Sequence, residues 1–145
     1  MPKASVKRLI ECKKEDLINL VLDIEKYPEF IPFCIDSKVY EKEDKEDEIA
    51  IIADLTIGKK PFVDTYKSDV RYDKKNDSIY VTNIGGPLKH LENNWKFIQK
   101  ENYTEVRFDV DFEIKNKFLN LIMTKSFQFG LNKIADAFQK KAESL

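Results

Sequence analysis

The clearest hydrophobic pattern in the chain runs from Thr104 to Ile114. Its apolar positions, which alternate with charged residues without a break, are Val106, Phe108, Val110, Phe112 and Ile114. A period of two residues places these side chains on one face of a β-strand and the charged side chains on the other. The pattern is typical of an antiparallel strand with one buried and one solvated face.

Strand patterns of similar length precede this segment. We expect strands at residues 4–12, 35–42, 48–57, 62–73, 77–84 and 89–99. The stretch from Ile49 to Ile57 is apolar on both faces, which predicts a central position in the sheet. The charge run Glu41–Glu48 predicts a solvated hairpin tip, and Gly85-Gly86-Pro87 predicts a turn. A parallel sheet is disfavoured, since no helical segments separate the later strands to make the crossovers.

Two segments have helical periodicity. Residues 14–25 form the first, and we expect Tyr27-Pro28 to end it because the residue before proline avoids helical angles. Residues 116–143 form the second, in which apolar residues step by three or four over about seven turns. The members of this long stripe are Leu119, Met123, Phe127, Leu131, Ile134, Phe138 and Ala142.

The predicted order of elements defines the fold class. One strand, a helical segment, six strands and a long helix predict an α+β domain over residues 1–145. The sheet and the long helix must bury their apolar faces against each other. We therefore expect a curved antiparallel sheet of about seven strands, wrapped on the C-terminal helix around an apolar interior.

Composition narrows the class of partner. The 145 residues include 25 basic and 26 acidic ones, for a net charge of −1. Since nucleic-acid binders usually carry a basic excess, we expect no DNA partner. No stretch approaches the ~20 apolar residues of a membrane span, and Met1 to Lys7 lack a signal-peptide core. We expect a cytoplasmic protein, and peripheral contact with a membrane stays compatible with the sequence.

Candidate chemistry is sparse. His90 is the single histidine, and with two isolated cysteines, Cys12 and Cys34, it does not supply a metal site. The order of residues leaves a Ser-His-Asp arrangement open, but no G-x-S-x-G or phosphate-binding glycine loop occurs. We therefore expect no catalytic residue, no metal and no cofactor.

The carboxylates have a simple interpretation. Asp109, Asp111 and Glu113 fall on the polar face of their strand, where solvation is the default. Asp54 and Asp64 stand in otherwise apolar strands, and we interpret them as hydrogen-bonded to a neighbouring strand or lysine.

Four segments resemble a known family. They are Leu20–Cys34 (LVLDIEKYPEFIPFC), Gly86–Leu91 (GPLKHL), Trp95-Lys96-Phe97 and Asp111–Ile114 (DFEI). In order and spacing they resemble the coenzyme Q-binding, START-like family. Its branches are the mitochondrial ubiquinone chaperones and the RatA-type ribosome-association toxins, and it also carries the label polyketide cyclase/dehydrase or oligoketide cyclase. Phe33 replaces the family's usual Trp, and Asn93-Asn94 replaces its usual Gly.

The resemblance implies a START/Bet v 1-like helix-grip fold with a hydrophobic tunnel. It implies non-enzymatic binding of a polyprenyl quinone such as ubiquinone, or of another lipid, in support of respiratory electron transport or lipid handling. The residues that we expect to line the tunnel are Phe30, Phe33, Tyr66, Leu91, Trp95, Phe108, Val110, Phe112, Met123, Phe127, Leu131 and Ile134. For any one of them, ordinary core packing is the commoner fate of a large apolar residue. Tyr27, Pro28 and Pro32 are the expected lid or mouth.

Two alternatives remain at this point. A toxin of the RatA type would bind ribosomal subunits and block their association, and it predicts a basic surface patch. Loose candidates for that patch are Lys59, Lys60, Lys67, Arg71 and Lys89. A polyketide or oligoketide cyclase, the other alternative, requires ionisable side chains inside the cavity.

Overall fold

The computed structural model describes residues 3–59, 62–85 and 88–145, and the side chains of these except residues 59, 62, 85, 88, 118–120 and 122–126. The strands are β1 (Lys3–Ile10), β2 (Cys34–Asp44), β3 (Glu48–Lys59), β4 (Phe62–Asp73), β5 (Ser78–Gly85), β6 (Leu88–Gln99) and β7 (Thr104–Ile114). The helices are α1 (Lys14–Leu22), the 3-10 turn η1 (Ile24–Lys26), α2 (Tyr27–Phe30) and α3 (Lys117–Glu143).

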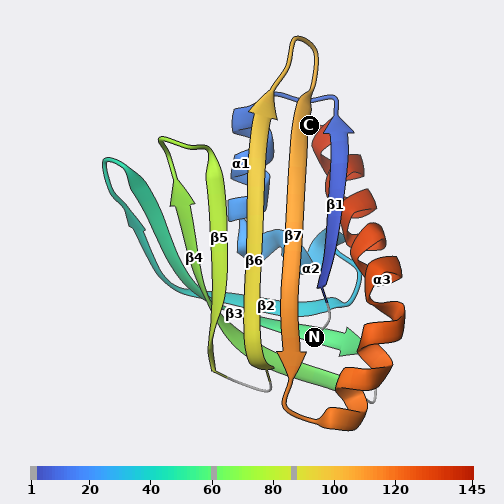
Figure 1. Cartoon of the computed structure of the whole chain (residues 1–145). Helices are drawn as coiled ribbons and strands as arrows, with labels where there is room; N and C mark the ends of the chain where they lie inside the picture. The colour runs from blue at the N-terminus through green and yellow to red at the C-terminus, as the bar shows by residue number, and fades with distance from the viewer. Residues whose placement is uncertain (1–2, 60–61, 86–87) are drawn as a thin grey trace.

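The seven strands form one antiparallel sheet in the order β1-β7-β6-β5-β4-β3-β2 (Figure 1). Strands β2 to β7 follow one another as hairpins, and β1 closes the other edge by pairing with β7. The expected α+β architecture is confirmed. The expected central position of Ile49–Ile57 is wrong, because β3 lies one strand from the edge. A strand next to the edge strand is still hydrogen-bonded on both sides. Its composition therefore does not distinguish it from a strand at the centre of the sheet.

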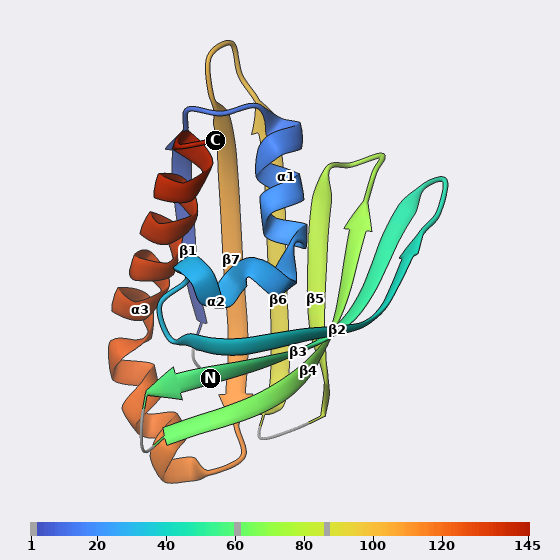
Figure 2. The same ribbon diagram turned by 180° about the vertical axis from the view of Figure 1, so that it is seen from behind.

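All helices lie on one face of the sheet, which we call the inner face (Figure 2). Helix α1 buries Leu17 and Val21, and Glu15 and Asp16 in its first turn suit the positive end of the helix. It ends at Leu22, earlier than the predicted residue 25. Pro28 does not follow a helix end but lies in the first turn of α2, where its missing N–H costs nothing.

Helix α3 has the predicted amphipathic stripe along its C-terminal half. Leu131, Ala135, Phe138 and Ala142 are buried and follow the spacing of three and four residues. They pack between β1 and the helices α1 and α2, so the apolar face of α3 contributes one wall of the core. No helix among the described residues is both long enough and apolar enough to cross a membrane.

Candidate functional site

The inner face carries a cluster of aromatic rings where β6, β7 and α3 meet. Trp95 stacks on Phe108 with ring centroids 4.0 Å apart, and Phe138 meets Trp95 edge to face with ring centroids 5.3 Å apart. Further along β7, the rings of Phe112 and Phe127 are 4.4 Å apart. Strand alternation places Phe108 and Phe112 on one face, and the α3 stripe brings Phe127 and Phe138 down on them.

The structure gathers most of the residues that we predicted to line a cavity. Leu91, Trp95, Phe108, Val110, Phe112 and Leu131 are buried, and Phe30, Tyr66, Phe127 and Ile134 are partly buried against them. Phe33 differs, since 43% of it is exposed. The side chain of Met123 lies outside the described residues. That these residues hold a ligand stays a prediction.

One end of the interior is filled by side chains. The cavity there has a volume of about 10 Å³ and is lined by Val6, Arg8, Ile10, Leu17, Trp95, Val106, Phe108, Ala135 and Phe138. That space corresponds to about one water molecule. A lipid chain therefore does not enter this end unless the helices move away from the sheet.

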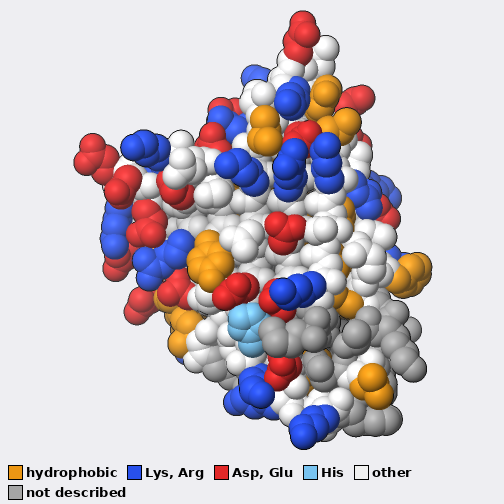
Figure 3. All heavy atoms as spheres, viewed as in Figure 1, with side chains coloured by type: hydrophobic (Ala, Val, Ile, Leu, Met, Phe, Trp, Pro, Cys, Tyr) orange, Lys and Arg blue, Asp and Glu red, His pale blue; other side chains and the backbone are white. Residues whose placement is uncertain are grey.

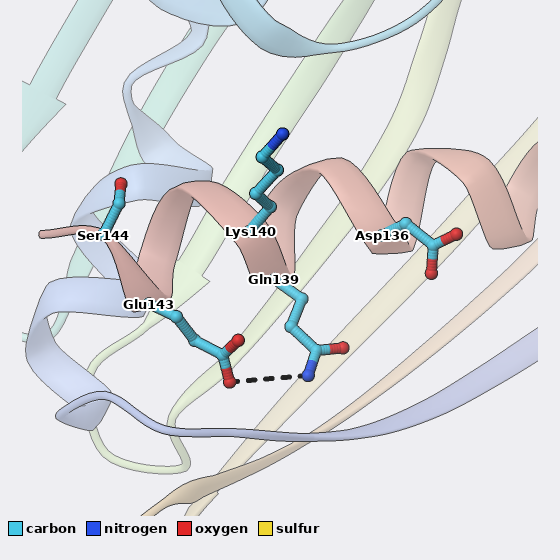
Figure 4. Close-up of a pocket in the computed structure, with 5 residues that line it drawn as sticks. All are labelled: Asp136, Gln139, Lys140, Glu143 and Ser144. Atoms are coloured by element: carbon cyan, nitrogen blue, oxygen red, sulfur yellow. Dashed lines mark hydrogen bonds between the residues drawn. The ribbon is translucent and has the colours of Figure 1, made fainter.

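A larger hollow of about 470 Å³ lies along the last turns of α3 (Figure 4). Its lining residues are Asp136, Gln139, Lys140, Glu143 and Ser144, all polar. Gln139 Nε2 donates a hydrogen bond to Glu143 Oε2 at 3.4 Å. The charged and open lining of this groove does not suit an apolar ligand.

The segment that we predicted as a lid is partly packed and partly exposed. The rings of Tyr27 and Phe30 each lie 5.5 Å from the Phe138 ring, edge to face. The Tyr27 hydroxyl donates a hydrogen bond to the Val21 carbonyl oxygen. Pro28 and Pro32 are half-buried. This half of the segment is thereby fixed to α1 and α3.

Phe33 ends the same segment in an unusual backbone conformation. Its φ angle is 69°, a left-handed value that costs a non-glycine residue free energy. The Phe33 carbonyl oxygen accepts a hydrogen bond from Gly58 N at 2.8 Å, which ties this turn to the end of β3. The exposed Ile35 follows it, so apolar side chains reach solvent beside the packed half of the segment.

Three titratable groups of the inner face and the predicted lid are held neutral. Burial raises the pKa of the Tyr27 and Tyr66 hydroxyls above their ordinary value. Burial, with a smaller contribution from Asp36, raises the pKa of the Cys34 thiol to about 11. These three groups therefore carry no charge at physiological pH.

Among the described residues, the buried polar and charged ones are Ser68, Thr104 and Glu105. Glu105 lies on the outer face, 3.5 Å from Lys7 Nζ and 3.1 Å from Arg107 Nε. Burial acts to raise its pKa, but the hydrogen bond from Arg107 and the charges of Lys7 and Arg107 outweigh it, so the pKa is lowered. The buried carboxylate is thus an ion-paired one outside the interior.

The other candidate carboxylates also lie away from the interior. Asp109 is exposed, and Asp111 Oδ2 lies 3.7 Å from both Lys3 Nζ and His90 Nε2. Asp54 accepts a hydrogen bond from the Tyr40 hydroxyl at 2.6 Å. Asp64 is exposed near the start of β4, and no group of three possible metal ligands occurs in the part of the chain that the structure describes.

Two polar residues of the inner face escaped the sequence analysis. Ser68 on β4 and Asn93 on β6 alternate in step with buried apolar neighbours, Val70 and Trp95 respectively. The sequence does carry a sign of them, since a polar residue at an inward position of a strand is unusual. The two residues do not stand out in the sequence, because β4 and β6 also carry polar residues on the outer face.

The chain also has relatives among known proteins. Residues 10–139 match the family described as polyketide cyclase / dehydrase and lipid transport. The ribosome association toxin RatA of Rickettsia prowazekii is 28% identical over 141 residues, which are 95% of this chain and 94% of the toxin. The coenzyme Q-binding protein COQ10 of Dictyostelium discoideum is 30% identical over 130 residues, 88% of this chain and 62% of that protein.

Solved structures with low sequence identity share the fold. The 18 kDa protein CC1736 of Caulobacter crescentus has a TM-score of 0.82 and 24% identity, covering 99% of this chain and 97% of its own. A START superfamily protein from Mycobacterium smegmatis has a TM-score of 0.79 and 16% identity over 98% and 97% of the two chains. The Zhui aromatase/cyclase from Streptomyces has a TM-score of 0.80 and 11% identity over 97% and 93%. The expected START-like fold is therefore confirmed.

Proposed function

Because the chain belongs to the polyketide cyclase / dehydrase and lipid transport family, we propose that it binds a hydrophobic ligand without transforming it. A polyprenyl quinone is the ligand class that the resemblance to COQ10 favours. The ring of a quinone suits stacking on the inner-face aromatics, and its prenyl tail suits the apolar stripe of α3. Each CH₂ of the tail gains about 0.8 kcal/mol on leaving water, so no charged anchor is required.

The observation that carries this proposal is the lack of fully buried charge on the described inner face, where the half-buried Arg8 is paired with Asp136 of α3. The described buried residues on that face are apolar or neutral, and the one buried carboxylate, Glu105, pairs with Lys7 and Arg107 on the other side. General acid–base catalysis needs a group that exchanges a proton near neutral pH. The raised pKa values of Tyr27, Tyr66 and Cys34 oppose that role. This favours a binding protein over a cyclase.

Exchange with a membrane surface is the second part of the proposal. Phe33 and Ile35 expose 43% and 51% of their surface beside the predicted lid. Exposed apolar side chains of this kind gain by insertion into a lipid interface. We expect this edge to contact the bilayer when a ligand enters or leaves.

Ligand binding is measurable through Trp95, the single tryptophan of the chain. Its indole is buried and stacked on Phe108, so a quinone ring that enters the aromatic cluster is expected to quench its fluorescence. Purified protein is titrated with a decyl-tailed ubiquinone, and lipid extracted from the purified protein is identified by mass spectrometry. Absence of bound lipid, together with no quenching and no quinone uptake from liposomes, would contradict the proposal.

A matched pair of substitutions on α3 tests the position of the ligand. Phe127→Ala removes a ring that contacts Phe112 at 4.4 Å, whereas Phe129→Ala removes one that is 65% exposed. We expect Phe127→Ala to weaken quinone binding about tenfold or more, in line with the area of one aromatic ring. Phe129→Ala is expected to bind as the wild type does.

A second candidate function is binding to ribosomal subunits, as the name of RatA states for that relative. The outer face offers a basic row for it: Lys7 and Lys96 are each paired in register with Arg107, and all three are exposed. Figure 3 shows this face, with basic and acidic side chains interspersed. Exposed basic side chains of this kind suit contacts with phosphates.

The patch that we predicted from the sequence is less suitable, because its cations have separate partners, whereas Lys7 and Arg107 of the basic row share the one carboxylate of Glu105. Arg71 pairs with Asp69 at 2.7 Å, and Lys89 pairs with Glu113 at 3.1 Å. Lys67 lies over the Tyr40 ring, while the side chain of Lys59 and the whole of Lys60 lie outside the described residues.

Ribosome profiles on sucrose gradients decide this second candidate. Overproduction of the wild type is expected to deplete joined ribosomes, and the double charge reversal Lys7→Glu/Lys96→Glu is expected to abolish the effect. The control is Lys42→Glu/Lys75→Glu, which makes the same charge change at exposed positions away from the row. Unchanged profiles with the wild type would rule the candidate out.

A further inference from the structure

Neutral polar side chains form a diagonal line across the inner face. Ser68 on β4 is paired in register with Asn83 on β5, and Asn93 on β6 is paired with Val81, two residues before Asn83. Side chains directly opposite on antiparallel strands lie about 5 Å apart, and diagonal neighbours about 7–8 Å. The line therefore passes through the middle of the sheet, next to Trp95 on the same face of β6.

Two atoms of this line are buried without a partner. Ser68 is 1% exposed, and neither its Oγ nor Asn93 Oδ1 has a hydrogen-bond partner within the described ranges. Asn83 differs, because its Oδ1 accepts a hydrogen bond from Leu91 N at 3.1 Å. A buried polar atom left unpaired costs about 1–3 kcal/mol. Each of the two atoms is therefore paired either by a buried water or by a polar group of a ligand that displaces the water.

The chemistry of the two atoms limits what can pair with them. The Asn93 side-chain oxygen only accepts hydrogen bonds, whereas the Ser68 hydroxyl both donates and accepts. A single type of group satisfies both atoms only if it brings an O–H or N–H. The buried described residues of the inner face carry no charge to balance an ion, so the group has to be neutral.

We propose that Ser68 and Asn93 form the polar end of the ligand site and bind a neutral hydroxyl-bearing aromatic head, of the phenol or quinol class. The inference rests on the proposed function, because the apolar remainder of the ligand supplies most of the affinity. The Trp95 indole lies two residues after Asn93 on the same face. It is buried and stacked on Phe108, so the ring of the ligand reaches it only when the helices move away from the sheet. A fully oxidised quinone lacks the donor that Asn93 Oδ1 needs, so the site discriminates in favour of the reduced form.

Three ligands of equal chain length test this at pH 7 by Trp95 fluorescence: 4-octylphenol, its methyl ether and octylbenzene. The methyl ether keeps the oxygen and removes the donor. We expect the phenol to bind about tenfold more tightly than the ether, which corresponds to about 1.4 kcal/mol for one hydrogen bond. Equal binding of all three would overturn the hydroxyl site and leave the proposed function standing. Binding of none of them would contradict the proposed function itself.

Substitutions test whether Ser68 and Asn93 cause the preference for the phenol over its methyl ether. The double substitution Ser68→Ala/Asn93→Leu is expected to reduce the phenol-to-ether ratio to about one, while affinity for octylbenzene stays the same or rises. The control is Asn94→Leu, which changes the exposed neighbour on the outer face and is expected to keep the tenfold ratio. Urea unfolding of each variant shows that it folds, and Asn93→Leu is expected to be at least as stable as the wild type. A ratio unaffected by both inner-face substitutions would overturn the assignment.

Discussion

Trp95 and Phe108 are stacked across neighbouring strands, with ring centroids 4.0 Å apart and an angle of 27° between the rings. The register pairs these two residues directly on β6 and β7. Phe138 of α3 meets the Trp95 ring edge-on at 5.3 Å, so one indole joins two strands and the long helix. The same indole lies beside the proposed polar line, which couples the stability of the fold to the ligand site.

Trp95→Ala is therefore expected to destabilise the protein by about 3–5 kcal/mol, the usual cost of deleting a buried large aromatic side chain. Urea unfolding followed by circular dichroism measures the change without relying on the lost fluorophore. Phe129→Ala serves as the control, because its ring is 65% exposed and its loss is expected to cost less than about 0.5 kcal/mol. Similar losses for both variants would mean that the Trp95 stack contributes little.

Glu105 is expected to make stability depend on acid pH. Its pKa in the folded chain is lowered from the ordinary value of 4.5, because Arg107 and Lys7 outweigh the effect of burial. A lowered folded-state pKa contributes stability above pH 4.5 that is lost as the pH falls through the folded value. Glu105→Gln should flatten the urea midpoint between pH 5 and pH 3, whereas Glu101→Gln, an exposed neighbour, should not. An unchanged acid profile in Glu105→Gln would contradict the role of the ion pairs.

The periodic parts of the chain were predictable, and the reason is physical. Alternation in β7 and the stripe from Leu131 to Ala142 each reflect one buried face, and the structure buries those faces. Element ends were less accurate: Pro28 was expected to end a helix and instead begins the turn of α2. Proline is excluded from helix interiors but tolerated in the first turn, so the residue alone does not distinguish the two cases.

The residues of the candidate site were largely predictable, but their arrangement in space was not. The sequence indicated which large apolar side chains face inward, yet Phe33, whose backbone is left-handed, is 43% exposed. Ser68 and Asn93 depend on the register of three strands, which no local pattern specifies. The pairing of Arg8 with Asp136 at 2.5 Å joins residues 128 positions apart and is likewise invisible to local reasoning.

The thiol of Cys34 is expected to react slowly with alkylating agents. Burial raises its pKa from the ordinary value of 9.0 to about 11, so the thiolate is scarce at neutral pH. A shift of this size lowers the thiolate fraction about a hundredfold below pH 9. In a Cys12→Ser background, iodoacetamide should modify folded Cys34 at least that much more slowly than the same thiol in urea. The reaction rate should rise up to about pH 11, and a midpoint near 9 would contradict the prediction.

The same shift predicts weaker folding in alkali. Because the folded-state pKa of Cys34 is raised, the stability that it contributes is present below pH 9 and lost as the pH rises through about 11. Tyr27 and Tyr66, whose pKa values are also raised by burial, act in the same direction above their ordinary value of 10.0. Urea midpoints between pH 8 and pH 11 should fall less steeply in Cys34→Ala than in the wild type.

Two substitutions of Phe33 distinguish the effect of its backbone strain on stability from the effect of its ring on ligand exchange. Its φ of 69° favours glycine, so Phe33→Gly should relieve the strain, and we expect a gain of up to about 1 kcal/mol after the entropy of glycine is subtracted. Phe33→Ala keeps the strained conformation and loses the same ring, so it should not be stabilised. If the exposed ring inserts into a bilayer, both variants should take up quinone from liposomes more slowly than the wild type, although their stabilities differ. Uptake that followed stability instead of the presence of the ring would show that Phe33 acts only through the backbone.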